Sequence, residues 1–300
     1  MTAPAPDTPS ALDREGLVVA VDPWRAFVRR FARSRRSLVA FWTIVLVVGV
    51  AILAPWISIY DPNVGGTDAL LPPLSAGHWL GTDHLGRDIW AQLAYGARVS
   101  LTVGVLAALS ALTIGVLVGA LSGYFGGWTD AVLMRVSEFF QTLPRFVVAL
   151  IIVALFGAGL FKLVLVIGFL SWPQTARVVR SSVLTLREST FVDAARVAGM
   201  GSRAIIFREI LPNVAATIIV MTGLAIASAI LLEAGLSFFG IGDPNMPSWG
   251  TMLNQAQEYL RLAWWMSLFP GLAIAIVVLS FNMISDGLND ALNPKLRDGS

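Results

Sequence analysis

The 300-residue chain contains no cysteine, only two histidines and few charged residues. The absence of cysteine excludes structural disulfides, thiolate metal sites and cysteine nucleophiles. Asp, Glu, Lys and Arg together make up 13% of the residues, whereas about 25% is usual in a soluble domain. Long uncharged stretches result, and an ordinary soluble protein is therefore not the expectation.

Several catalytic motifs are also absent from the chain. There is no Gly-x-x-x-x-Gly-Lys-Ser/Thr phosphate loop, no His-Glu-x-x-His zinc motif and no Gly-x-Ser-x-Gly nucleophile motif. A membrane enzyme is therefore disfavoured, and the sequence predicts no catalytic residue, no metal and no cofactor. If ATP drives the process in which this chain takes part, another chain must hydrolyse it.

Apolar residues are abundant, at 56% of the chain. A bilayer core of roughly 30 Å is crossed by about 20 apolar residues in a helix. The sequence therefore predicts an all-α, polytopic membrane protein with six transmembrane helices, over residues 38–59, 99–121, 130–156, 160–176, 213–232 and 264–284.

Positive charge is concentrated in three places: residues 25–36, residues 177–208 and the last residues, with Lys295 and Arg297. Because cytoplasmic loops carry an excess of Lys and Arg, these regions are predicted to be cytoplasmic. Both termini then lie in the cytoplasm, and segments 60–97 and 236–263 lie outside. Binding of nucleic acid by these arginines is a weaker alternative.

The first 23 residues are rich in proline and predict a tail without a fold, and the basic segment 24–36 predicts a short interfacial helix. In the second span, Gly115, Gly119 and Gly123 repeat every four residues and so share one helix face. Close packing against another helix is the favoured explanation, and a role in a substrate path is the alternative.

Segment 189–212 is polar and lies between two membrane-length apolar runs. Thr190 is a candidate cap for a short helix, and Gly199 can end that helix in a left-handed conformation. Ser202 can cap a second helix, which Pro212 separates from the following span. The pattern predicts two short, exposed helices at an angle to each other.

This segment also has the composition of a docking site. Ala194 and Ala195 would let a partner backbone approach closely, and apolar anchors would come from Phe191, Val192, Ile205, Ile206 and Phe207. An interfacial hairpin without any partner is the alternative that spacing alone leaves open.

The order Asp193-Ala194-Ala195, Gly199, Leu211-Pro212 resembles the "EAA" loop of permease subunits in bacterial ATP-binding-cassette (ABC) importers. Two residues depart from that pattern: Asp193 replaces the usual Glu, and Glu209 stands where an apolar residue is common. The resemblance implies a loop that docks on the ATPase, with these candidate residues: Thr190, Phe191, Asp193, Ala194, Ala195, Gly199, Ser202, Phe207, Leu211 and Pro212.

Other blocks narrow the resemblance to the C-type permease of dipeptide and oligopeptide importers. They are residues 78–88 with Leu-Gly-Thr-Asp-x-x-Gly-Arg-Asp, the continuation 98–101, the external segments 233–240 and 247–250, and the C-terminal block 286–294. Together the resemblance covers about residues 25–297.

This resemblance implies the type I ABC importer permease fold and a set of partners. These are a homologous second permease, two cytoplasmic ATPase domains, an external substrate-binding protein and the lipid bilayer of the bacterial inner membrane, with no nucleic acid. Short peptides are the implied cargo, with nickel chelates, haem, glutathione or another small solute as alternatives. A secondary transporter is a remote alternative, because the spans over residues 99–121, 213–232 and 264–284 carry almost no charge at mid-membrane.

The same resemblance divides the chain into four parts. Residues 1–36 would be a cytoplasmic tail with the interfacial helix, and residues 37–97 the first span with an external loop. Residues 98–287 would be the transmembrane core with the coupling loop 189–212, and residues 288–300 a cytoplasmic tail.

Isolated polar residues are interpreted as structural. Asp83, Arg87 and Asp88 are expected to brace the external loop, and Trp249 belongs to the second external segment. His78 and His84 could bind a metal, but their spacing does not favour it. The sequence does not identify the pore-lining residues.

Two further acids, Glu138 and Glu233, have expected structural roles. Glu138 is expected to pair with Arg135 on one helix face. Glu233, at the outer end of a span, is interpreted as a structural brace, with a functional role as the alternative.

Overall fold

The computed structural model describes residues 31–32, 34–75, 77–243 and 246–292. The expected tail 1–23 lies outside these residues, as do most of the interfacial helix expected over 24–36 and residues 293–300 of the C-terminal tail. In the described part the chain is helical and contains no β-strand, only isolated bridges. The all-α prediction is confirmed there.

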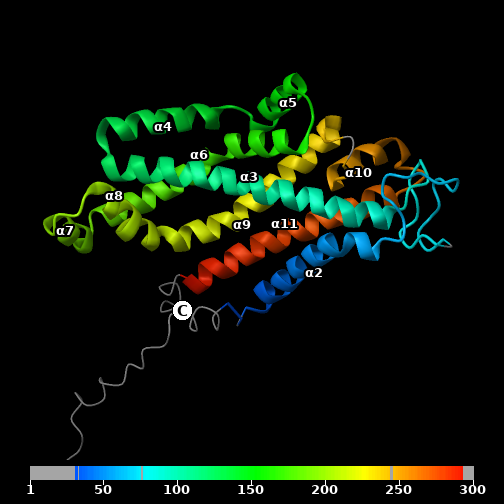
Figure 1. Ribbon diagram of the computed structural model, residues 1–300, viewed down its shortest axis with the longest axis horizontal. Coiled ribbons are helices and arrows are strands. Elements are labelled where there is room, and N and C mark those ends of the chain that lie inside the picture. The colour runs from blue at the N-terminus through cyan, green and yellow to red at the C-terminus, as the bar shows by residue number, and fades with distance from the viewer. Residues whose placement is uncertain (1–30, 33, 76, 244–245, 293–300) are drawn as a thin grey trace, which may run out of the picture.

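Long helices run side by side and form an elongated bundle (Figure 1). They are α2 (Arg35–Ile57), α3 (Ile89–Phe125), α6 (Leu160–Arg187), α9 (Leu211–Leu236) and α11 (Trp265–Leu292). The shorter helices are α4 (Gly127–Thr142), α5 (Arg145–Phe156), α7 (Thr190–Val197), α8 (Ser202–Ala204) and α10 (Trp249–Ala256).

Four helical segments are long and apolar enough to cross a membrane: Arg35–Ile57, Ile89–Phe125, Ser202–Ile241 and Trp265–Leu292. A fifth span is counted if the bent pair Gly127–Thr142 and Arg145–Phe156 crosses as one. The structure therefore supports a multi-pass membrane protein with four or five strongly apolar spans.

The span predicted over residues 130–156 is not one helix. α4 and α5 meet at an angle of 83°. Pro144 explains the break, because a residue that precedes proline is driven out of the helical region, and Leu143 is extended with φ −76° and ψ 135°.

Two other predicted boundaries were wrong. The helix expected to end with the span at residue 176 continues as α6 to Arg187. Val179 and Val183 are buried on one face of this extension while Arg177 is exposed, so an amphipathic helix continues beyond the apolar run. Similarly, α3 begins at Ile89, ten residues before the predicted start of that span, because Asp88 caps the helix there.

The glycine face of α3 packs against α6, as predicted. A Cβ atom at Gly115 would lie 2.6 Å from the Thr175 Cβ, and one at Gly119 would lie 2.5 Å from the Ala176 carbonyl oxygen. A Cβ at Gly123 would lie 2.9 Å from the Arg180 carbonyl oxygen. Glycine therefore allows the two helix backbones to approach closely along three successive turns.

The external segment before the last span contains a helix that was not predicted, α10. Ser248 and Thr251 form a reciprocal capping box at its start. Buried Trp249 and Met252 join α10 to the core cluster formed with α3, α9 and α11. The helix is short, and tertiary packing stabilises it.

Candidate functional site

Helix α7 and the short α8 lie at one end of the bundle, and the long loop between α2 and α3 lies at the other (Figure 1). The first residues of α2 and the last residues of α11 also point toward the α7 end (Figure 1). The segment predicted to dock on an ATPase is thus at the opposite end from the segment predicted to be external.

The start of α7 differs from the prediction. Ser189, and not Thr190, is the N-cap residue, and its side chain donates to the Leu186 carbonyl oxygen and caps no α7 amide. Thr190 is the first residue of the helix and is exposed. Ser202 likewise begins α8 and does not cap it, because Gly201 occupies that place. Both caps are therefore one residue earlier than expected.

The end of α7 is as predicted at Gly199, which has a left-handed φ of +79°. The Gly199 N–H donates to the Arg196 carbonyl oxygen at 3.0 Å, and the Met200 N–H donates to the Ala195 carbonyl oxygen at 3.0 Å. This pair of bonds is the Schellman motif, which requires a residue with positive φ. A Cβ at Gly199 would meet no atom within 4 Å, so backbone conformation and not space makes glycine the suitable residue.

One face of α7 is fixed to the bundle. Val192 is fully buried, and Ala195 is 9% exposed. They belong to a hydrophobic cluster with Ala120 and Tyr124 of α3, Val179 and Val183 of α6, Ile205, Ile206, Ile210 and Val214. Of the residues expected to contact a partner, Val192, Ala195, Ile205 and Ile206 therefore pack inside this chain. Only residues on the other face remain available.

The exposed face of α7 carries Phe191, Asp193, Ala194 and Val197, and Val197 is 90% exposed. Asp193 pairs with Arg196 at 2.8 Å one helical turn later. Phe207, which follows on the next helix, is 57% exposed. We call the set Phe191, Ala194, Val197 and Phe207 the α7 surface. It is apolar, with a charged edge.

Pro212 does not separate two helices. The chain is helical without a break from Ser202 to Leu236, with a π-helical segment at Ile205–Ile210. The Leu211 N–H donates to the Ile206 carbonyl oxygen five residues back, and this wider turn accommodates the proline that follows. The Asn213 side-chain amide donates to the Glu209 carbonyl oxygen at 2.6 Å. The helix that follows α7 is thus continuous with the membrane-length helix α9.

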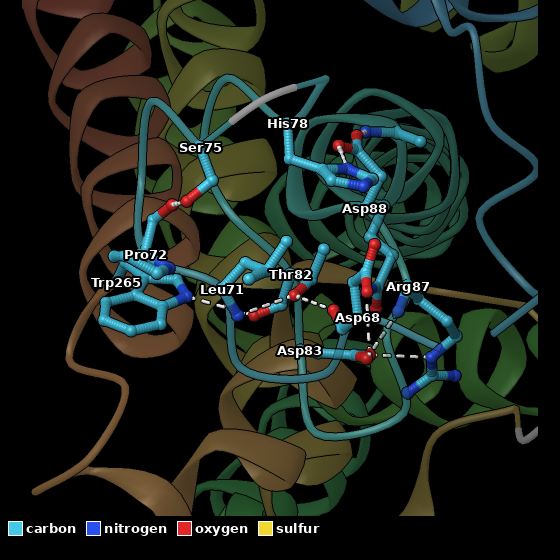
Figure 2. Close-up of polar contacts among 12 residues, drawn as sticks. Asp68, Leu71, Pro72, Ser75, His78, Thr82, Asp83, Arg87, Asp88 and Trp265 are labelled. Atoms are coloured by element: carbon cyan, nitrogen blue, oxygen red, sulfur yellow. Dashed lines mark hydrogen bonds and ion pairs between the residues drawn. The ribbon is translucent and has the colours of Figure 1, made fainter. Parts of the chain in front are cut away.

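At the opposite end, Asp83 is the centre of a buried polar network, shown in Figure 2. One carboxylate oxygen accepts from the backbone N–H groups of Leu85 (2.8 Å) and Arg87 (2.9 Å). The other accepts from Arg87 Nε at 2.7 Å and from Gln92 Nε2 at 3.0 Å. Arg87 then donates to Gln255 Oε1 at 2.7 Å. The network ties the loop to α3 and α10.

Asp88 and Thr82 fix the rest of this loop (Figure 2). Asp88 accepts from the Ala91 N–H at the start of α3 and lies 2.8 Å from His78 Nδ1. Thr82 donates its hydroxyl to the Asp68 carbonyl oxygen, and Trp265 Nε1 donates to the Thr82 carbonyl oxygen. Both predicted acids thus have structural partners.

The two histidines have separate neighbours. The ring of His78 stacks on Tyr60 with centroids 4.6 Å apart, and the ring of His84 stacks on Tyr259 at 4.8 Å. Among the described residues no group of three or more His, Cys, Asp or Glu side chains could hold a metal ion.

Trp249 and Glu233 form a second buried junction. Trp249 donates its indole N–H to the Leu93 carbonyl oxygen at 3.0 Å and its backbone N–H to the Ser100 hydroxyl at 3.3 Å. Glu233 accepts from Ser100 at 3.1 Å and from Ser237 at 2.7 Å. These contacts join α3, α9 and α10. The roles of Ser100 and Gln255 were not predicted, because their partners Glu233 and Arg87 are 133 and 168 residues away in the chain. The role of Gln92 was also not predicted, although its partner Asp83 is only nine residues away.

Two family profiles match the chain. The profile described as "Binding-protein-dependent transport system inner membrane component" matches residues 115–298. The profile described as "N-terminal TM domain of oligopeptide transport permease C" matches residues 22–73.

Similar proteins span nearly the whole chain. A glutathione transport system permease protein, GsiD, of Pectobacterium atrosepticum is 39% identical over 277 residues, 92% of each chain. A dipeptide transport system permease protein, DppC, of Alkalihalophilus pseudofirmus is 39% identical over 298 residues, 99% of this chain and 97% of that protein. A di/tripeptide transport system permease protein, DppC, of Pseudomonas aeruginosa is 39% identical over 290 residues, 94% of this chain and 96% of that protein.

Proposed function

The chain belongs to the family of binding-protein-dependent transport system inner membrane components, and on this premise we propose that it is the permease subunit of an ATP-driven importer of short peptides. It forms half of the translocation pathway. Its location is the inner membrane, which it crosses several times.

The proposed topology has six spans: α2, α3, the bent pair α4 and α5, α6, α9 and α11. The ends of α2 and α11 that point toward α7 then lie in the cytoplasm with α7 itself (Figure 1). Arg187 at the end of α6, followed by Arg196, Arg203 and Arg208, supports this orientation. The four segments 1–36, 37–97, 98–287 and 288–300 keep the roles expected from the sequence.

The observation that carries the coupling role is the two-sided character of α7. Its inner face is buried against α3, α6 and the helix that leads into α9, while its outer face presents exposed apolar side chains. A partner that moves the α7 surface must also move the ends of these helices. Coupling requires that a partner contact its target differently in two states, and this geometry would transmit that difference to the membrane helices.

The chain itself is a transport component and not an enzyme. ATP would be hydrolysed by two ATPase domains that dock on the α7 surface. A homologous second permease would complete the pathway, and an external substrate-binding protein would deliver cargo to the end formed by residues 58–88 and α10.

Short peptides are the proposed cargo, because two of the similar proteins are named for dipeptide and di/tripeptide transport. Glutathione is the second candidate cargo, because a relative with the same sequence identity to this chain, 39%, is named for glutathione transport. Nickel chelates and haem are less favoured, because none of these names mentions them.

Co-purification and transport test this proposal together. The chain alone in liposomes should neither hydrolyse ATP nor accumulate peptide, and both activities should appear when the second permease, the ATPases and the binding protein are added. ATP-driven uptake by the isolated chain would refute the assignment. A complete complex that ignores dipeptides and imports glutathione would select the second cargo.

The docking surface can be tested with a matched pair of variants. Val197→Glu places a charge on the α7 surface and should abolish retention of the ATPases. Val64→Glu introduces the same charge at a position that is 65% exposed at the opposite end, and it should have no effect on ATPase retention. Equal retention in both variants would exclude the α7 surface as the docking site.

A further inference from the structure

A charged cleft lies between α4 and α6, and its lining residues belong to neither site described above. Its volume is about 400 Å³, and it is lined by Met134, Ser137, Glu138, Arg177 and Arg180. Small-molecule sites have volumes of roughly 300–1,000 Å³. The cleft is therefore large enough for a small solute. We call it the α4–α6 cleft.

Charged side chains are exposed around this cleft. Arg135 and Glu138 pair at 3.2 Å, as the sequence predicts, yet their side chains remain 86% and 54% exposed. Arg177 is exposed on the facing helix. Ionisable groups within membrane spans face other protein or a water-filled cavity, because contact with hydrocarbon is costly. The cleft must therefore face water or another subunit.

The cleft is also well inside the length of the bundle. Arg177 precedes the last residue of α6, Arg187, by ten positions, which corresponds to roughly 15 Å along a helix. Of the five long helices in the described part of the chain, α6 is the one that is not apolar enough to count as a membrane span. Polar residues in its second half, among them Gln174, Arg177 and Arg180, account for that difference.

Among the described residues, only one of the two arginines that line the cleft has an ion-pair partner. Arg180 is bound by Asp130 through two contacts of 2.5 and 2.6 Å, and Ser122 also donates to Asp130. The charge of Arg180 is thus balanced within the chain. Arg177 has no ion-pair partner among the residues that the structure describes. Its planar guanidinium is suited to bind a carboxylate through two parallel hydrogen bonds.

We propose that the α4–α6 cleft lines the aqueous path of the importer and that Arg177 binds a carboxylate of the passing cargo. The inference rests on the proposed function, because it needs a cargo that crosses the membrane. Dipeptides and glutathione both carry a terminal carboxylate, so the assignment does not depend on which of them is imported. Arg180, held by Asp130, positions the wall of the cleft.

Thiol labelling tests whether the cleft contains water. The chain has no cysteine, so Met134→Cys introduces a single thiol into the cleft. In the complete complex with its second permease, this thiol should react with a charged, water-soluble methanethiosulfonate, and saturating cargo should slow the reaction. Phe139→Cys is the control on the opposite side of α4, and it should react slowly with or without cargo.

A charge variant tests the carboxylate contact. For dialanine, or for glutathione if the complex imports that instead, Arg177→Gln should raise the KM for uptake roughly tenfold, the size expected for one charge-assisted hydrogen bond. The change in KM should be specific to the carboxylate. For the C-terminal amide of the same cargo, the KM should therefore differ little between the parent and Arg177→Gln. The binding protein is the same in both complexes, so its own preference cancels in the comparison.

Three outcomes would overturn the inference while leaving the importer assignment intact. In the first, ATP-driven uptake is normal but Met134→Cys reacts only when the second permease is absent, which would make the cleft a subunit interface. In the second, Arg177→Gln prevents the two permeases from co-purifying, which would also show that the cleft is a subunit interface. In the third, the KM values of the free acid and the amide change equally. A complete complex without ATP-driven uptake would instead refute the proposed function.

Discussion

Replacement of Gly199 by valine is the sharpest test of coupling. Gly199 has a φ of +79° and closes the Schellman motif at the end of α7. A left-handed conformation costs an L-residue roughly 1–2 kcal/mol, and a β-branched residue is a genuine outlier there. No atom lies within 4 Å of the added Cβ, so steric conflict inside the chain adds nothing to this cost.

A cost of this size is too small to disrupt the membrane helices, which are stabilised by separate core clusters. It is large enough to shift the turn: 1–2 kcal/mol changes an equilibrium by a factor of roughly 5–30. The end of α7 would relax, and Val197 and the rest of the α7 surface would lose their positions. Gly199→Val should therefore pair normally with the second permease but bind the ATPases and import cargo much more weakly.

The assay is co-purification of the ATPases and ATP-driven uptake, both normalised to the amount of the chain in the membrane. Gly201→Val is the matched control, because Gly201 is two residues away, has a φ of −69° and also has open space around its Cβ. Gly199→Asn should be tolerated, since asparagine adopts the left-handed conformation more readily. Normal ATPase binding and uptake by Gly199→Val would show that the loop is not the coupling element.

Three further predictions concern topology and stability. A cysteine at exposed Trp79 should react with an impermeant maleimide in intact cells, whereas one at Ser202 should react only after lysis; external labelling of Ser202 would contradict the six-span proposal. Glu233→Ala should destabilise the solubilised protein by about 1–3 kcal/mol, because it leaves two buried serine hydroxyls without their acceptor, and an unchanged thermal midpoint would argue against the junction. Gly119→Val should cost about 1–3 kcal/mol or prevent folding by overpacking α3 against α6, while Gly49→Val, in open space, should be harmless; similar membrane levels and thermal midpoints of the two variants would refute that packing.

Some features were predictable because a short stretch of sequence encodes them. Helicity and membrane location follow from apolar composition and run length. The close contact of α3 with α6 follows from glycines repeated every four residues, because that spacing places them on one face whatever lies opposite. The turn at Gly199 was also predictable, because the motif that ends a helix involves neighbouring residues only.

Other features depended on residues far apart in the chain. Ala194 and Ala195 are adjacent and identical in sequence, yet only Ala194 is exposed, because Ala195 packs within the cluster formed with α3 and α6. Pro212 was a local failure of prediction: it did not end a helix, because a π-helical turn between Ile206 and Leu211 accommodates it.

The sequence by itself determined that this chain is a helical membrane protein with the motifs of an importer permease. Only the tertiary structure decided which face of α7 is free, how Asp83 and Glu233 are satisfied, and where exposed charges meet between α4 and α6. Local periodicity and backbone preference act over a few residues and can be read along the chain. The partner of a side chain is set by packing: Arg87 binds Gln255 and Ser100 binds Glu233, across separations of 168 and 133 residues that no spacing rule covers.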